Sequence, residues 1–213
     1  MNMTLLKTSI AAALFAAALP AHANLIANGS FEDGSYNGNA NFMTLGAGST
    51  SIAGWTVGSG SIDWIFNYWQ ASDGHFSLDL SGNGAGSIAA STGFNTVAGQ
   101  TYLVQFDMSG NPDNGGGPRM LTLALNNAPV NRYVYDTIAN GTTRGDMNWV
   151  THTFSFVGDG NLTTLTFGSG NTSAWGPALD NVIVTTVNVP EPATLGLLGL
   201  GLLGLGAVRR RRG

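Results

Sequence analysis

The 213-residue chain contains no cysteine, and this absence excludes several classes of protein. Without thiols the chain forms no disulfide, no thiolate zinc site and no cysteine nucleophile. It also lacks the G-x-S-x-G, H-E-x-x-H and P-loop patterns of common hydrolases, zinc proteases and nucleotide-binding proteins. The chain must therefore be stabilised by packing, hydrogen bonds or a bound metal ion.

Basic residues are scarce in the middle of the chain. Between Asn24 and Val189 there are three arginines (Arg119, Arg132 and Arg144), no lysine and eleven carboxylates, which gives a formal charge of −8. Such a surface repels phosphate backbones, so nucleic acid is not an expected partner. Hard cations and neutral ligands suit it better.

The first 23 residues read as a secretory signal peptide. Lys7 supplies the positive start, Ile10 to Leu19 form an apolar run, and Ala21-His22-Ala23 is a small-x-small cleavage site. The apolar run is short for a membrane span. We therefore expect export, with cleavage after Ala23.

Residues 189–213 form a second hydrophobic end. The run from Ala193 to Val208 has 16 residues, about 24 Å as a helix, against a bilayer core of roughly 30 Å. The arginines behind it predict a single transmembrane helix, at least transiently in the inner membrane, with a cytoplasmic end. The run contains G-L-G-L-L-G from Gly199 to Gly204, but only nine residues follow, so no nucleotide site is predicted.

Residues 24–188 predict one all-β domain. Short β-type runs such as "TYLVQFDM" and "WVTHTFSFV" recur between Gly, Asn, Ser and Asp clusters, at a spacing typical of sandwiches and barrels. No stretch keeps a helical apolar period with capping residues. We expect a two-sheet sandwich of about ten strands. The glycine-rich segment Asn111–Pro118 is either a functional loop or a long hairpin connection.

The C-terminal end resembles the PEP-CTERM sorting signal of Gram-negative bacteria. The matching residues, in order, are Pro190, Glu191 and Pro192, the apolar run, and then Arg209, Arg210, Arg211 and Arg212. The resemblance implies processing near the Pro-Glu-Pro triplet by an exosortase, and placement at the cell surface or in the extracellular matrix. It also associates the protein with extracellular polysaccharide and biofilm. A permanent anchor without processing is the alternative.

The domain itself resembles the bacterial choice-of-anchor C family, which is related to a plant cell-wall domain of unknown function. The resemblance rests on stretches throughout the domain, including "NLIANGSFEDG", "SIAGWTVGSGSIDWI", "AGQTYLVQFDMSGNPD" and "GPALDNVIV". It implies a galactose-binding-like jelly roll. It does not identify a ligand, because one fold hosts many functions.

Acidic residues in apolar surroundings raise the question of a metal ion. Asp180 stands among apolar residues in "ALDNVIV", and Asp79 and Asp107 stand in similar strand patterns, where an ionised carboxylate is costly unless paired. In related jelly rolls an early Glu and a late Asp help to hold a structural calcium, and Glu32 and Asp180 occupy the matching positions. The resemblance therefore implies one structural Ca²⁺ at these two residues. The alternative is that both accept hydrogen bonds from backbone N–H groups.

Aromatic residues cluster between Ser61 and His75. Sugar rings stack on flat aromatic side chains, and Asp63, Trp64, Tyr68 and Trp69 are the expected carbohydrate-binding residues. The alternative is that these rings belong to the core, where aromatics bury large areas. Exposure of Trp64 and Trp69 together on one face favours binding, and burial of both favours a structural role.

Three functions follow from these patterns. The first is a non-catalytic carbohydrate-binding or adhesion module of the cell surface or matrix. The second is a structural matrix protein without a small ligand. The third and weakest is a glycan-active enzyme, with Asp63 and Asp107 as nominal catalytic carboxylates because such pairs need only meet in space.

Overall fold

The computed structural model describes residues 23–187, and every regular element within them is a β-strand. The sequence predicts about ten strands, and the described residues form thirteen, several of them short. In chain order they are β1 (Phe42–Gly46), β2 (Trp55–Ser59), β3 (Ser61–Ile65), β4 (Ser77–Asp79), β5 (Ser87–Ala90), β6 (Phe94–Asn95), β7 (Thr101–Gly110), β8 (Pro118–Leu125), β9 (Ala128–Asp136), β10 (Val150–Val157), β11 (Leu162–Thr163), β12 (Leu165–Ser169) and β13 (Pro177–Thr186).

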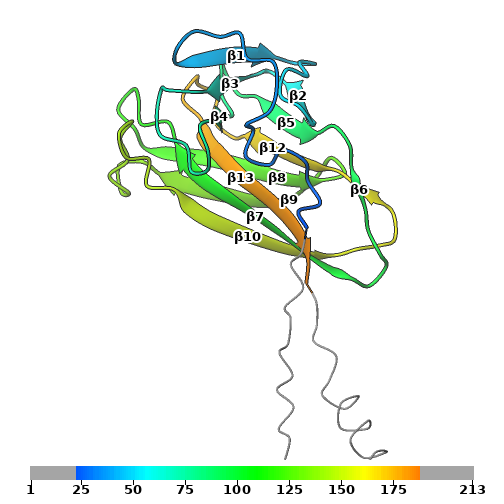
Figure 1. Ribbon diagram of the computed structural model, residues 1–213. Coiled ribbons are helices and arrows are strands. Elements are labelled where there is room, and N and C mark those ends of the chain that lie inside the picture. The colour runs from blue at the N-terminus through cyan, green and yellow to red at the C-terminus, as the bar shows by residue number, and fades with distance from the viewer. Residues whose placement is uncertain (1–22, 188–213) are drawn as a thin grey trace, which may run out of the picture.

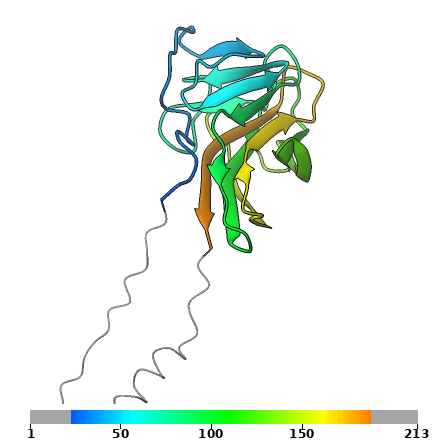
Figure 2. The same ribbon diagram turned by 90° about the vertical axis from the view of Figure 1, so that its right-hand side faces the viewer.

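The strands form two large sheets that pack as the layers of a jelly-roll sandwich (Figures 1 and 2). One sheet has six strands in the order β1-β3-β4-β13-β7-β10, and the other has five in the order β2-β5-β12-β8-β9. Strands β6 and β11 pair as a separate ribbon. The chain crosses between the two sheets several times, and all strand pairs are antiparallel. The all-β prediction is confirmed.

The main core lies between the two sheets. Alternate residues of each strand point inward, so Trp64 of β3, Leu78 of β4 and Leu179 of β13 lie side by side in the register and are all buried. Trp55 and Phe167 of the facing sheet pack in the same cluster. Burial of large aromatic and aliphatic side chains supplies most of the stabilisation of such a core.

The opposite face of the six-stranded sheet is partly covered by loops. A second, smaller apolar cluster forms there from Ile65, Trp69, Met147 and Ala178. The loop after β3 contributes Trp69, and the segment before β10 contributes Met147. This face therefore has an apolar floor beside its polar strand residues.

The two ends of the described chain lie together at one end of the sandwich (Figure 1). The backbone N–H of Leu25 donates to the Val184 carbonyl at 2.8 Å, close to the end of β13. The predicted signal peptide up to His22 and the predicted sorting signal with its transmembrane helix lie outside the described residues. Between residues 23 and 187 no helix has the length and apolar character to cross a membrane.

Candidate functional site

A cavity of about 200 Å³ opens on the outer face of the six-stranded sheet, over β1, β3 and β4. Aromatic and hydrogen-bonding side chains line it together. The aromatic residues are Phe42, Tyr68, Trp69 and Trp175, and the polar ones are Thr44, Asp63, Asp79, Asn83, Asn111 and Asp113.

Strand register brings Asp63 and Asp79 to this cavity. They are paired across β3 and β4, and the next pair along, Trp64 and Leu78, points into the core. Because successive side chains of a strand alternate in direction, both carboxyl groups must face outward. Two like charges directly opposite each other on a sheet are unfavourable.

Asp79 relieves this repulsion by holding its proton. Burial raises the pKa of Asp79 to about 8, and the negative charge of Asp63 raises it further. Three hydrogen bonds oppose the rise, from the N–H groups of Ser81 at 2.9 Å and Gly176 at 3.1 Å and from Nδ2 of Asn111 at 2.8 Å. The carboxyl group of Asp79 is thus a buried, fully positioned part of the cavity wall.

Asp63 is half-buried and less fully bonded. Burial raises its pKa, and the Thr44 hydroxyl, which donates to Oδ1 at 2.5 Å, acts in the opposite direction. No described residue donates a hydrogen bond to Oδ2 of Asp63. One carboxylate oxygen is therefore available to a ligand in the cavity.

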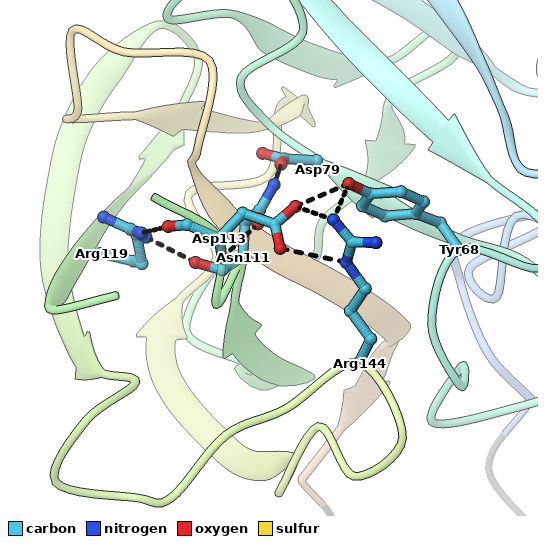
Figure 3. A network of polar contacts seen from close by, with 6 residues as sticks. All are labelled: Tyr68, Asp79, Asn111, Asp113, Arg119 and Arg144. Carbon is cyan, nitrogen blue, oxygen red and sulfur yellow. Dashed lines mark hydrogen bonds and ion pairs between the residues drawn. The ribbon is translucent and has the colours of Figure 1, made fainter. Parts of the chain in front are cut away.

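One rim of the cavity is a polar network of Tyr68, Asp113 and Arg144 (Figure 3). Asp113 accepts from Nε of Arg144 at 3.0 Å and from Nη2 at 2.6 Å, and it accepts the Tyr68 hydroxyl at 2.6 Å. The guanidinium also lies over the Tyr68 ring, 4.0 Å from its centre, and donates to the Tyr68 oxygen. The network holds the Tyr68 ring in place at the cavity.

Protonation states in this network follow from those contacts. Burial opposes ionisation of Asp113, but the hydrogen bonds from Arg144 and Tyr68 outweigh it and leave the pKa of Asp113 below its ordinary value. Burial and the adjacent Asp113 together raise the pKa of Tyr68 to about 12. At neutral pH the rim therefore carries an ion pair and a neutral phenol.

The segment between β7 and β8 supplies Asn111 and Asp113. Arg119 holds it from the side opposite Tyr68, with Nε donating to the Asn111 carbonyl at 2.9 Å and Nη2 to the Asp113 carbonyl at 3.1 Å (Figure 3). Because β7 and β8 belong to different sheets, the segment is not a hairpin connection. Of the two interpretations made for Asn111–Pro118, the hairpin is wrong.

The predicted carbohydrate-binding residues do not all lie at the cavity. Asp63 and Tyr68 line the cavity, as does Trp69, although the Trp69 side chain is only 4% exposed and its indole donates to the Ser77 hydroxyl at 2.9 Å. Trp64 is 1% exposed and donates to the Phe31 carbonyl at 3.0 Å. The prediction of Trp64 as a sugar-stacking ring is wrong, because its neighbour Asp63 already faces outward and Trp64 must face the core.

The sequence prediction missed Trp175, Phe42 and Asn83. Trp175 is half-buried in the loop before β13, and its indole N–H has no hydrogen bond within the described residues. The side-chain amide of Asn83 is exposed and equally free. These residues are distant in sequence from Tyr68, so only the strand order could have brought them together.

Glu32 and Asp180 both contact the loop between β3 and β4. Asp180 is fully buried, and its oxygens accept the N–H groups of Ser72 at 2.7 Å, Asp73 at 3.0 Å and Asn181 at 2.7 Å. Oε1 of Glu32 accepts the N–H groups of His75 at 2.9 Å and Phe76 at 2.7 Å. Burial raises the pKa of Asp180 to about 8.

These contacts bear on the expected calcium ion. Both carboxylates serve as acceptors for backbone N–H groups, and residues 23–187 contain no group of three or more His, Cys, Asp or Glu that suits a metal ion. Calcium at Glu32 and Asp180 remains a prediction.

The nominal catalytic pair is not brought together. Asp63 lies on β3 and Asp107 on β7, with β4 and β13 between them. Asp107 is bonded to the hydroxyls of Ser72 at 2.5 Å and Thr151 at 2.6 Å and to Nδ2 of Asn181 at 3.0 Å. Asp107 therefore helps Asp180 to hold the loop between β3 and β4 at Ser72.

Comparison with known proteins identifies the family. Residues 24–185 match the family described as "Protein of unknown function (DUF642)". The chain belongs to the DUF642 family. Residues 188–212 match the PEP-CTERM protein-sorting motif, which implies export to the cell surface of a Gram-negative bacterium with processing by an exosortase. Both resemblances seen in the sequence are thus confirmed.

Relatives of this DUF642 protein include part of a much larger protein. Halomucin of Haloquadratum walsbyi is 34% identical over 186 residues, which cover 80% of this chain and 2% of halomucin. The chain therefore spans only a small fraction of that relative.

Two carbohydrate-binding modules are similar in structure to the DUF642 protein. One is the family 35 module of Paenibacillus barcinonensis, with a TM-score of 0.43, 19% identity and coverage of 67% of this chain and 98% of the module. The other is TmCBM61, solved with β-1,4-galactotriose, with a TM-score of 0.43, 16% identity and coverage of 78% and 99%. Likenesses of this size carry no conclusion about a ligand.

Proposed function

We propose that this DUF642 protein is a non-catalytic carbohydrate-binding module of the cell surface or extracellular matrix, and that the cavity over β1, β3 and β4 takes the glycan. One observation carries the proposal. The cavity combines aromatic rings with hydrogen-bonding groups that have no partner within the described residues: Oδ2 of Asp63, the amide of Asn83 and the indole N–H of Trp175.

This combination suits a sugar. The C–H face of a pyranose packs against an aromatic ring, and its hydroxyl groups need fixed polar partners, as binding pockets of small molecules generally provide. A volume of about 200 Å³ is enough for about one sugar ring and leaves the rest of a chain outside. Adhesion to extracellular polysaccharide or biofilm matrix is the corresponding biological role.

The position of the cavity supports this role. Trp175 stands just before β13, and the end of the described chain stands just after it. A strand of ten residues spans roughly 30 Å at about 3.3 Å per residue. The cavity therefore lies at the opposite end of β13 from Val187, the last described residue.

A structural matrix protein without a small ligand is the second candidate. Burial of both Trp64 and Trp69 favours it, because the predicted pair of exposed tryptophans is not formed. On this account contacts between proteins hold the matrix and the cavity stays without a glycan.

Binding of the purified protein to a glycan array separates the two candidates. The carbohydrate proposal predicts a restricted set of bound glycans and at least tenfold weaker binding by Trp175→Ala. Val97→Ala removes an exposed apolar side chain outside the cavity and should leave binding unchanged. Absence of binding to every glycan, or equal binding by the Trp175→Ala variant, would overturn it.

A further inference from the structure

The charge of Asp63 is not compensated by the protein. The one salt bridge in the described part of the chain joins Arg144 to Asp113. Arg119 donates to backbone carbonyls of Asn111 and Asp113, and Arg132 lies on β9 in the other sheet. With no lysine between Asn24 and Val187, Asp63 has the Thr44 hydroxyl as its hydrogen-bond donor.

The Asp63 and Asp79 pair also retains a proton. The two residues face each other across neighbouring strands, and the raised pKa of Asp79 keeps its carboxyl group largely protonated near neutrality. Desolvated carboxyl groups hold protons where no other cation is at hand. A cationic group in the cavity would supply the positive charge that the protein does not place beside Asp63.

A neutral sugar does not meet this requirement. Its hydroxyl donates to the free Oδ2 of Asp63 but leaves the half-buried charge unpaired. A protonated amine makes a charge-assisted hydrogen bond, roughly twice as strong as a neutral one. An acidic sugar would place a second negative charge beside the unpaired carboxylate of Asp63 and is disfavoured.

We propose that the ligand is a glycan with free amino groups, such as a chain of glucosamine residues, and that an ammonium group pairs with Asp63 while the ring packs against Trp175 or Tyr68. This inference rests on the proposed function and narrows it to one class of polysaccharide. The Tyr68–Asp113–Arg144 network then has a defined part: it engages Arg144, the arginine at the cavity rim, in an ion pair with Asp113, so that Arg144 does not neutralise Asp63.

Isothermal titration with three sets of oligosaccharides of equal length tests the inference: glucosamine, N-acetylglucosamine and galacturonic acid. The wild-type protein should bind the glucosamine series at least tenfold more tightly than the N-acetylated series and should not bind galacturonic acid measurably. This ranking requires no variant, so it does not depend on how a substitution folds.

A charge-removing variant tests the residue. Asp63→Asn should lose at least tenfold in affinity for glucosamine oligosaccharides and retain its affinity for the N-acetylated ones. Asp33→Asn makes the same charge change at an exposed position outside the cavity and should leave both affinities unchanged.

The outcomes separate the two proposals. Equal or tighter binding of neutral or acidic oligosaccharides, or an unaffected Asp63→Asn variant, would overturn the amino-sugar inference and leave carbohydrate binding intact. If no glycan of any class binds, both proposals fail.

Discussion

Glu32 and Asp180 hold opposite ends of the same five residues. Asp180 accepts the N–H groups of Ser72 and Asp73, and Glu32 accepts those of His75 and Phe76. The two residues come from opposite ends of the domain sequence, so the loop between β3 and β4 is fastened only when the fold is complete. The same loop contains Tyr68 and Trp69, which line the cavity.

Calcium at Glu32 and Asp180 predicts a response to chelation. An ion that binds only the folded state at 100 times its Kd adds about 2.7 kcal/mol, which corresponds to at least about 5 °C in Tm for a domain of this size. Melting curves in calcium and in EDTA should differ by that amount. In Glu32→Gln, which retains an oxygen for the N–H groups of His75 and Phe76, the difference should vanish. Superimposable wild-type curves would rule the ion out.

Stability should fall as the pH rises from 5 to 9. The pKa of Asp79 is about 8 in the folded protein and about 3.9 when unfolded, so the folded state binds more protons in this window. The stabilisation that comes from the raised pKa of Asp79 is complete below pH 4 and is lost as the pH rises through 8. The raised pKa of Asp180 acts in the same direction.

Asp79→Asn should reduce this pH dependence by up to about 1.4 kcal/mol per pH unit, the value for one proton. Urea unfolding at pH 5, 7 and 9 measures it, with Asp33→Asn as a control that leaves the slope unchanged. Identical slopes for wild type and Asp79→Asn would contradict the assigned protonation of Asp79.

Substitution of Trp64 and substitution of Trp175 should have different effects on stability. The Trp64 ring packs on Phe76 and Tyr36 in the core, so Trp64→Ala should lower the free energy of unfolding by about 3–5 kcal/mol. Trp175 is half-buried at the cavity, and Trp175→Ala should cost only about 1 kcal/mol. Chemical denaturation of both variants tests this, and equal losses would show that Trp175 is a core residue instead.

Export and sorting predict the ends of the mature protein. Intact-mass spectrometry of the protein from its own cell should find Asn24 as the first residue and no trace of Arg209–Arg212. A product that still carries Lys7 and the terminal arginines would show that neither end is processed.

The sequence predicts the fold well because a strand pattern is local. Alternation in "SIDWI" or "THTFSF" needs only neighbouring residues, and both segments are strands. The same alternation shows that Asp63 and Trp64 cannot share a face, a consequence that the carbohydrate prediction overlooked. The cavity is harder to predict, since Phe42, Asp79, Asp113 and Trp175 meet only through the order β1-β3-β4-β13-β7 and the loops at its edge.

The irregularity in β13 could not be predicted from the sequence either. The register shifts between Asp180 and Ile183, and Asn181 adopts a positive φ of 50°. This irregularity lets Asp180 reach the loop at Ser72 and Asn181 reach Asp107. A run such as "ALDNVIV" reads as a regular strand, and nothing in its composition marks the shift.

The most direct test of the central claim is to add a glycan that binds and to follow the indole N–H signals of the five tryptophans. Four of them donate within the domain, from Trp55 to Asn28, Trp64 to Phe31, Trp69 to Ser77 and Trp149 to Gln70. In two-dimensional NMR of the labelled protein, the Trp175 indole signal should move most, and those of Trp55 and Trp64 should stay in place. Saturating binding that leaves the Trp175 signal unmoved would contradict the assignment of this cavity as the glycan site.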